Sequence, residues 1–122
     1  MILGCIDIGS NTTRLLVADA GGGHLRELVT QRAFTRIGRS LSRGGEIPSA
    51  KITETAEVAG TQARVAREVG AEQVVAVATA AIRGAANREE LCTAVEHAGG
   101  MPLSVLSSDC LLYTSPSPRD RS

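Results

Sequence analysis

The chain has 122 residues, a length that suits one domain with a single hydrophobic core. Its 13 basic and 13 acidic residues cancel, which argues against a general nucleic-acid-binding surface and leaves polyanion binding to local sites and metal ions. Phe34 and Tyr113 are the sole Phe and Tyr and Trp is absent, so stacking platforms for single strands or sugars are excluded.

The three cysteines, Cys5, Cys92 and Cys110, have no paired spacing, which predicts neither a zinc site nor a disulfide framework. No apolar run approaches the roughly 18 residues of a membrane span, and no basic segment leads into an apolar stretch as in a signal peptide. We therefore expect a cytoplasmic protein with no membrane partner.

The N-terminal third of the chain contains three strand candidates: Ile2–Ile8, Thr13–Ala20 and Leu25–Ile37. Gly21-Gly22-Gly23 supplies the turn between the second and the third, so the sequence predicts an antiparallel meander. Gln31 and Arg32 interrupt the third segment, a pattern that is typical of an edge strand with one wet side.

A short polar loop, Gly9 to Thr12, joins the first two strands. Gly9 permits a tight turn, and the next three residues place hydroxyl and amide groups beside exposed backbone N–H groups, which suits a phosphate. Alternation along the first strand brings Asp7 to the mouth of the loop, where a carboxylate is useful if it holds a hydrated Mg²⁺ that bridges to the phosphate. The alternative is that Asp7 and Asn11 are ordinary turn formers.

A helix is expected from Pro48 to Gly70, with Pro48 or Ser49 near its start. Its apolar stripe recurs at helical spacing: Ile52, Ala56, Ala59, Ala63 and Ala66. Because most of the stripe is alanine, the helix can approach a sheet closely but buries little area. Ile52 and the flanking valines must therefore anchor it.

Gln73 to Thr79 contains a continuous apolar run, as expected of a central strand that is covered on both faces. The segment that follows, Ala80 to Arg83, leaves the carboxyl end of this strand, where open α/β sheets place their ligands. Arg83 is therefore a second site candidate, because a guanidinium there can hold a phosphoryl group through paired N–H bonds. An ion pair with a nearby carboxylate is the competing interpretation.

The last elements are a helix and a short strand. Asn87 and Glu90 have the spacing of a capping pair, ahead of an apolar stripe formed by Leu91, Ala94, Val95 and Ala98. Gly99-Gly100 ends this helix, and Leu103 to Leu106 forms the last strand. His97 is expected at the surface, without a catalytic role. The sum is an α/β fold of βββαβαβ order, a mixed sheet with helices packed on it.

Asp7 to Thr12, followed by Arg14-Leu15-Leu16-Val17-Ala18, resembles the opening of the exopolyphosphatase and guanosine pentaphosphate phosphatase family. Three more stretches agree in the family's order: Thr35-Arg36-Ile37-Gly38, Ala78 to Arg83, and Ala86-Asn87-Arg88. That family belongs to the actin, sugar-kinase and chaperone ATPase superfamily. The resemblance implies that residues 1–108 form the N-terminal lobe, ribonuclease H-like and actin-like, of a two-lobed phosphatase domain.

The resemblance also implies an activity, the Mg²⁺-assisted attack of water on the terminal phosphate of polyphosphate or guanosine pentaphosphate. It implies a metal ligand, Asp7, a further anion contact, Arg36, and a phosphate-binding set: Gly9, Ser10, Asn11, Thr12 and Arg83. Two alternatives stay open. One is an ATP-dependent sugar or acid kinase of the same superfamily, and the other is a non-catalytic phosphate- or nucleotide-binding module. The preferred substrate and the oligomeric state are also open, a homodimer of the intact protein included.

The sequence departs from this family after Ser107. The resemblance implies a Ser-Gly-Glu-Glu-Glu-Ala-Arg stretch here, whose glutamate is the general base that activates water, whereas this chain has no glutamate beyond that point. Cys110 to Asp120 reads like a translated sequencing adapter, so residues 109–122 are expected to be a non-native, disordered tail. We therefore expect no catalytic residue in this fragment and no turnover by it.

Overall fold

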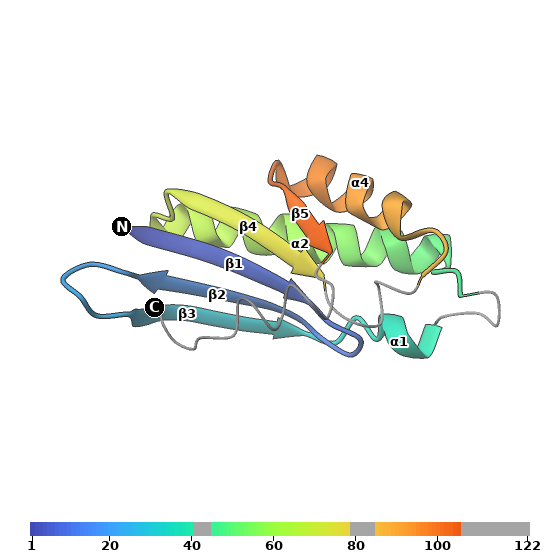
Figure 1. The fold of residues 1–122 in the computed structure, drawn as a ribbon, viewed down its shortest axis with the longest axis horizontal. Helices are drawn as coiled ribbons and strands as arrows, with labels where there is room; N and C mark the ends of the chain where they lie inside the picture. Colours follow the sequence, from blue (N-terminus) through green and yellow to red (C-terminus); the bar gives the residue numbers. More distant parts are fainter. Residues whose placement is uncertain (41–44, 79–84, 106–122) are drawn as a thin grey trace.

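The computed structural model describes residues 1–40, 45–78 and 85–105 (Figure 1). Its strands are β1 (Ile2–Ile8), β2 (Thr13–Asp19), β3 (Arg26–Ala33), β4 (Gln73–Ala78) and β5 (Leu103–Val105). Its helices are α1 (Ile37–Ser40), α2 (Ser49–Val69) and α4 (Arg88–Gly99). The predicted order is confirmed, with the short helix α1 added. The expected tail at 109–122 lies outside the described residues.

The five strands form one mixed sheet in the order β3-β2-β1-β4-β5. The first three strands pair antiparallel, as the predicted meander requires, and β4 pairs parallel with both β1 and β5. β3 lies at the edge of the sheet, as its interrupted pattern predicted. The parallel pairs need crossover connections, and the long helix α2 supplies one of them between β3 and β4.

The third strand is shorter than predicted, because the segment expected to run to Ile37 ends at Ala33. Thr35 turns inward and is 1% exposed, and Arg36 adopts a left-handed backbone conformation with φ of 53°. Ile37 then begins α1 with its side chain fully buried. The left-handed backbone at Arg36 therefore marks the change of direction after β3, and the last part of the predicted strand forms the start of α1.

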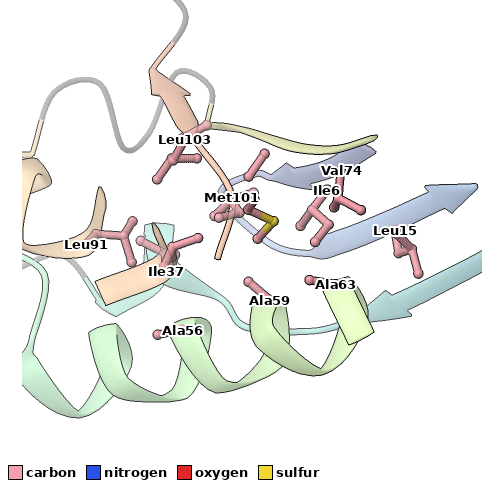
Figure 2. Close-up of a cluster of buried hydrophobic side chains, with 14 of the residues drawn as sticks. Ile6, Leu15, Ile37, Ala56, Ala59, Ala63, Val74, Leu91, Met101 and Leu103 are labelled. Atoms are coloured by element: carbon pink, nitrogen blue, oxygen red, sulfur yellow. The ribbon is translucent and has the colours of Figure 1, made fainter. Parts of the chain in front are cut away.

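Helix α2 packs its alanine stripe against the sheet, as predicted. Figure 2 shows Ala56, Ala59 and Ala63 on the side of α2 that faces the buried cluster around Ile6. The helix approaches β1 so closely that a Cβ atom added to Gly4 would lie 3.0 Å from the Cβ of Ala66. Small side chains on both elements therefore set the distance between helix and sheet.

The helix α4 begins differently from the prediction. Asn87 stands at its N-cap, but its side chain forms no capping hydrogen bond, so the capping pair with Glu90 is wrong. The Asn87 carboxamide instead accepts a hydrogen bond from the Ile47 N–H at 2.8 Å and donates one to the Ile47 carbonyl at 2.9 Å. Ala98 is exposed, contrary to the predicted stripe, and Gly99 is buried in its place. His97 is exposed near the helix end, as predicted.

The prediction that β4 is covered on both faces is also wrong. Val75 is 41% exposed, because alternate residues of β4 point away from the face that carries the buried core. We call the sheet face opposite this core the outer face; it includes Leu3, Cys5, Asp7, Arg14, Leu16, Thr30, Arg32, Val75 and Val77. None of the helices in the described part of the chain is long and apolar enough to span a membrane.

Candidate functional site

The polar loop Gly9–Thr12 is folded into a closed turn between β1 and β2. The Gly9 N–H donates to the Thr12 carbonyl at 2.9 Å, while Ser10 and Asn11 are exposed. The carbonyls of Ser10 and Asn11 accept hydrogen bonds from the Gly38 N–H at 2.8 Å and the Arg36 N–H at 3.0 Å. Within residues 1–40, 45–78 and 85–105, no main-chain acceptor satisfies the N–H groups of Ser10, Asn11 and Thr12. Successive N–H groups without main-chain acceptors in a turn are the kind of donor set that can bind an anion.

The segment from Thr35 to Gly38 forms one wall of this loop, and Figure 1 shows α1 beside the turn between β1 and β2. A Cβ atom on Gly38 would lie 3.0 Å from the Cβ of Ser10, so this close approach depends on glycine. Arg36 lies in the left-handed region, and its guanidinium carbon is 5.9 Å from the centroid of the Phe34 ring. Backbone strain at a non-glycine residue is concentrated at ligand-binding positions.

A set of buried polar contacts supports the loop and its wall from below. The hydroxyls of Thr13 and Thr35 are 2.8 Å apart, and the Gln62 Nε2 donates to the Thr13 carbonyl at 3.1 Å. Lys51 donates through Nζ to the Thr35 carbonyl at 2.9 Å. Two side chains of helix α2 therefore hydrogen-bond to the first residue of β2 and to the first residue of the wall segment. The sequence analysis missed these contacts, although one signal was present: Gln62 stands beside an otherwise apolar helix stripe.

Asp7 lies on the outer face, two residues before the loop begins to turn. Its Oδ1 atom is buried and has no hydrogen-bond partner among the residues that the structure describes. An unpaired buried carboxylate oxygen is unfavourable unless a donor or a cation reaches it. Asp7 faces Arg14 across β1 and β2, but no ion pair joins these two described residues.

The donor set fits Mg²⁺ better than a metal that needs a full protein cage. Among residues 1–40, 45–78 and 85–105, no group of three or more His, Cys, Asp or Glu side chains could hold a metal ion. Mg²⁺ is usually bound through one or two carboxylates together with waters and substrate phosphates. The Oδ1 atom of Asp7, which has no partner in the described part of the chain and lies next to a phosphate-type loop, matches that requirement.

The negative charge of Asp7 also acts on Cys5, two residues earlier on the same face. Burial raises the pKa of the Cys5 thiol, the Asp7 carboxylate raises the pKa further, and Arg14 lowers it. Cys5 is therefore protonated and unreactive near neutral pH, and it packs as a small apolar side chain.

Strands β1 and β4 end side by side. They run parallel, and their last pair is Ile8 with Ala78, so the chain leaves both strands at the same edge of the sheet. Arg83 lies outside the described residues, and its predicted place beside the loop is untested. Of the predicted site residues that are described, Asp7 and Gly9–Thr12 are close in sequence, and the main chain of Arg36 is hydrogen-bonded to the loop at Asn11. A hollow of about 460 Å³ between β3 and α2, lined in part by Gln31 and Glu57, has none of these residues in its lining.

Comparison with known proteins identifies the family. The family model of the Ppx/GppA phosphatases matches residues 5–109. The chain belongs to the Ppx/GppA phosphatase family. The match includes Asp7, the loop and Arg36, and it favours the phosphatase expectation over the sugar or acid kinase alternative.

Individual Ppx/GppA relatives agree with this assignment. Exopolyphosphatase 1 of Mycobacterium leprae is 34% identical over 107 residues, covering 87% of this chain and 32% of that protein. An uncharacterised protein of Streptomyces coelicolor is 34% identical over 104 residues, covering 85% of this chain and 31% of that protein. The crystal structure of the Aquifex aeolicus family member superposes with a TM-score of 0.82 at 32% identity, covering 88% of this chain and 35% of that one. The chain thus spans about a third of the length of the curated relatives it matches.

Proposed function

We propose that this chain is the N-terminal part of a Ppx/GppA phosphohydrolase that removes the terminal phosphate from polyphosphate or guanosine pentaphosphate. One observation carries the proposal: among the described residues, a buried carboxylate oxygen of Asp7 has no hydrogen-bond partner, and the N–H groups of Ser10, Asn11 and Thr12 in the turn that follows have no main-chain acceptor. A phosphoryl group would supply acceptors for those N–H groups, and a Mg²⁺ ion would supply a partner for Asp7. The relative named exopolyphosphatase supports polyphosphate as a substrate class.

In this proposal the chain's own residues bind and orient the terminal phosphoryl group. The N–H groups of Ser10, Asn11 and Thr12 and their side chains donate to its oxygens. Arg36, on the wall segment, is a further donor, and Arg83 keeps the phosphate-binding role that the family resemblance implies. Fixed donors of this kind favour the charge that builds up as the phosphoryl group is transferred, and they do not need to reorganise when it forms.

Asp7 would hold a Mg²⁺ ion. When bound, that ion neutralises charge on the phosphoryl oxygens and on the leaving group. The family resemblance implies a glutamate general base after Ser107, and no glutamate follows Ser107 in these 122 residues. We therefore propose that these 122 residues bind phosphate and metal without catalytic turnover.

Calorimetry of this chain with Mg²⁺ and tripolyphosphate tests the proposal. We expect Mg²⁺-dependent binding that Asp7→Asn weakens by about 10-fold, equivalent to about 1.4 kcal/mol. Asp19→Asn is the matched control, since this carboxylate lies on β2 away from the loop and pairs with Met1 and Arg26. Equal affinity of the wild-type and Asp7→Asn chains for Mg²⁺ and tripolyphosphate would contradict the proposed role of Asp7.

A further inference from the structure

Lys51 is the sole lysine of the sequence, and it lies in the first turn of α2. The N-terminus of a helix carries partial positive charge, so a cation there is unfavourable, and no acidic residue in the first turn of α2 offsets it. Lys51 forms an ion pair with Glu54 at 2.9 Å, but a partly exposed pair of this kind contributes little stability. The position of Lys51 is better explained by its second partner, which lies on the wall segment.

That second partner is the Thr35 carbonyl, to which the Lys51 Nζ donates at 2.9 Å. The Thr35 carbonyl and the Arg36 N–H belong to one peptide group, and this N–H donates to the Asn11 carbonyl of the loop at 3.0 Å. The ammonium group therefore binds one end of a peptide group whose other end binds the loop. Hydrogen bonds in such a chain polarise one another, so a charged donor at the carbonyl strengthens the bond that the N–H donates.

A second peptide group continues this chain of contacts into the loop. The Asn11 carbonyl belongs to the peptide group that Asn11 shares with Thr12, and this peptide bond is trans. The C=O and N–H of a planar trans peptide point in opposite directions, so a carbonyl held at the wall segment turns the Thr12 N–H away from the wall. The Thr12 N–H is one of the donors that the proposed function assigns to the phosphoryl group.

The backbone of Arg36 supports the same role for Lys51. Arg36 has φ of 53°, a left-handed conformation that persists in a non-glycine residue only where the surroundings fix it. Lys51 and Asn11 fix the peptide group that precedes Arg36. The Thr35 side chain is held as well, by the Thr13 hydroxyl. Loss of the Lys51 contact would remove one of these restraints and let the wall segment relax toward an unstrained backbone.

We propose that Lys51 is a positioning residue for the phosphate-type loop. Its ammonium group holds the peptide between Thr35 and Arg36, and through Asn11 it fixes the direction of the Thr12 N–H. This inference rests on the proposed function and deepens it, because it assigns control of ligand affinity to a side chain of α2 that need not touch the ligand.

Lys51→Met tests this role in the 122-residue chain, because it keeps the apolar stem and removes the donor and the charge. We expect hydrogen exchange of the Arg36 amide, followed by NMR, to become about 10-fold faster. The affinity for Mg²⁺ and tripolyphosphate should weaken by about fivefold. Glu54→Gln is the control for the ion pair, and Arg64→Met is the control for net charge, since Arg64 is exposed on the same helix. Both controls should match the wild-type chain.

The exchange of other amides separates positioning from a general loss of stability. The inference is overturned if Lys51→Met behaves as the controls do, or if Arg36 exchanges faster while the affinity is unchanged. It is also overturned if the amide of Ile6, in the core strand β1, accelerates as much as that of Arg36. A wild-type chain that binds no tripolyphosphate would contradict the proposed function itself. Faster exchange confined to Arg36 in Lys51→Met would then still support the hold of Lys51 on the wall segment.

Discussion

The side-chain hydroxyls of Thr13 and Thr35 lie 2.8 Å apart in the core, although 22 positions separate the two residues along the chain. Both side chains are almost fully buried, at 0% and 1% exposure. Thr13 opens β2 directly after the phosphate-type loop, and Thr35 opens the wall segment that binds the loop carbonyls. Their hydrogen bond therefore couples the position of the loop to that of its wall.

Replacing either hydroxyl of this pair alone should cost more than half of the stability that is lost when both are replaced. Thr13→Val or Thr35→Val leaves the other hydroxyl buried without its partner, which costs about 1–3 kcal/mol. The double variant removes both polar groups and should lose less than the sum of the two single changes. Urea unfolding of the four chains measures this difference. Strict additivity would show that the two hydroxyls do not depend on each other.

Gly38→Ala should impair ligand binding without a large loss of stability. The new methyl group would lie 3.0 Å from the Cβ of Ser10, so the loop must shift away from its wall. We expect binding of Mg²⁺ and tripolyphosphate to weaken several-fold. Gly4→Ala is the matched control, since its methyl group would meet Ala66 at the same 3.0 Å distance but on the core face. Gly4→Ala should lower the urea midpoint and leave the affinity for tripolyphosphate unchanged. Equal affinity of Gly38→Ala and Gly4→Ala would contradict a role of the wall segment in binding.

Local patterns in the sequence were enough to predict most of the fold. The alanine stripe of α2 identified its buried face, and Gly70, which ends the helix with φ of 113°, identified its boundary. The polar interruption at Gln31 and Arg32 placed β3 at the sheet edge. These features depend on contacts between one element and its immediate neighbours, and so they leave a periodic trace in the chain.

The errors involve partners that are distant in sequence. Asn87 is a residue type that often caps helices, but its carboxamide is hydrogen-bonded to the main chain of Ile47, 40 positions away. The apolar run of β4 shows that its side chains suit burial, yet it carries no information on which face the helices cover. Residue pattern alone indicated the candidate site only where it is contiguous, at Asp7 and Gly9–Thr12, and Arg36 was added by the family resemblance. Its wall hydrogen bonds join Ser10 and Asn11 to Gly38 and Arg36, so they depend on how two segments distant in sequence come together.

Substitutions at Asn87 distinguish its observed contacts from the predicted cap. Asn87→Ala removes both hydrogen bonds to Ile47, and we expect a loss of about 1–3 kcal/mol. Asn87→Ser restores a good capping residue but cannot span to both the N–H and the carbonyl of Ile47, so it should be about as destabilising as Asn87→Ala. Thermal or urea unfolding provides the measurement. Wild-type stability of Asn87→Ser would instead support a capping role.

The reactivity of Cys5 reports on a metal ion at Asp7 without any need for catalysis. Burial raises the pKa of the Cys5 thiol, and the Asp7 charge raises it further, so at about pH 8 little thiolate is present and alkylation is slow. A cation at Asp7 cancels that negative charge and lowers the Cys5 pKa. We therefore expect Mg²⁺ with tripolyphosphate to accelerate alkylation of Cys5 by iodoacetamide. Mass spectrometry of the modified peptide measures this rate.

Two comparisons make this measurement specific. Asp7→Asn should raise the alkylation rate of Cys5 in the absence of metal and make that rate insensitive to Mg²⁺, because the charge that shifts the thiol pKa is gone. Cys92 is the internal control, since its pKa is raised chiefly by burial and next by Glu96, both unrelated to Asp7. A Cys5 rate that Mg²⁺ does not change in the wild-type chain, while tripolyphosphate binds, would place the metal ion away from Asp7.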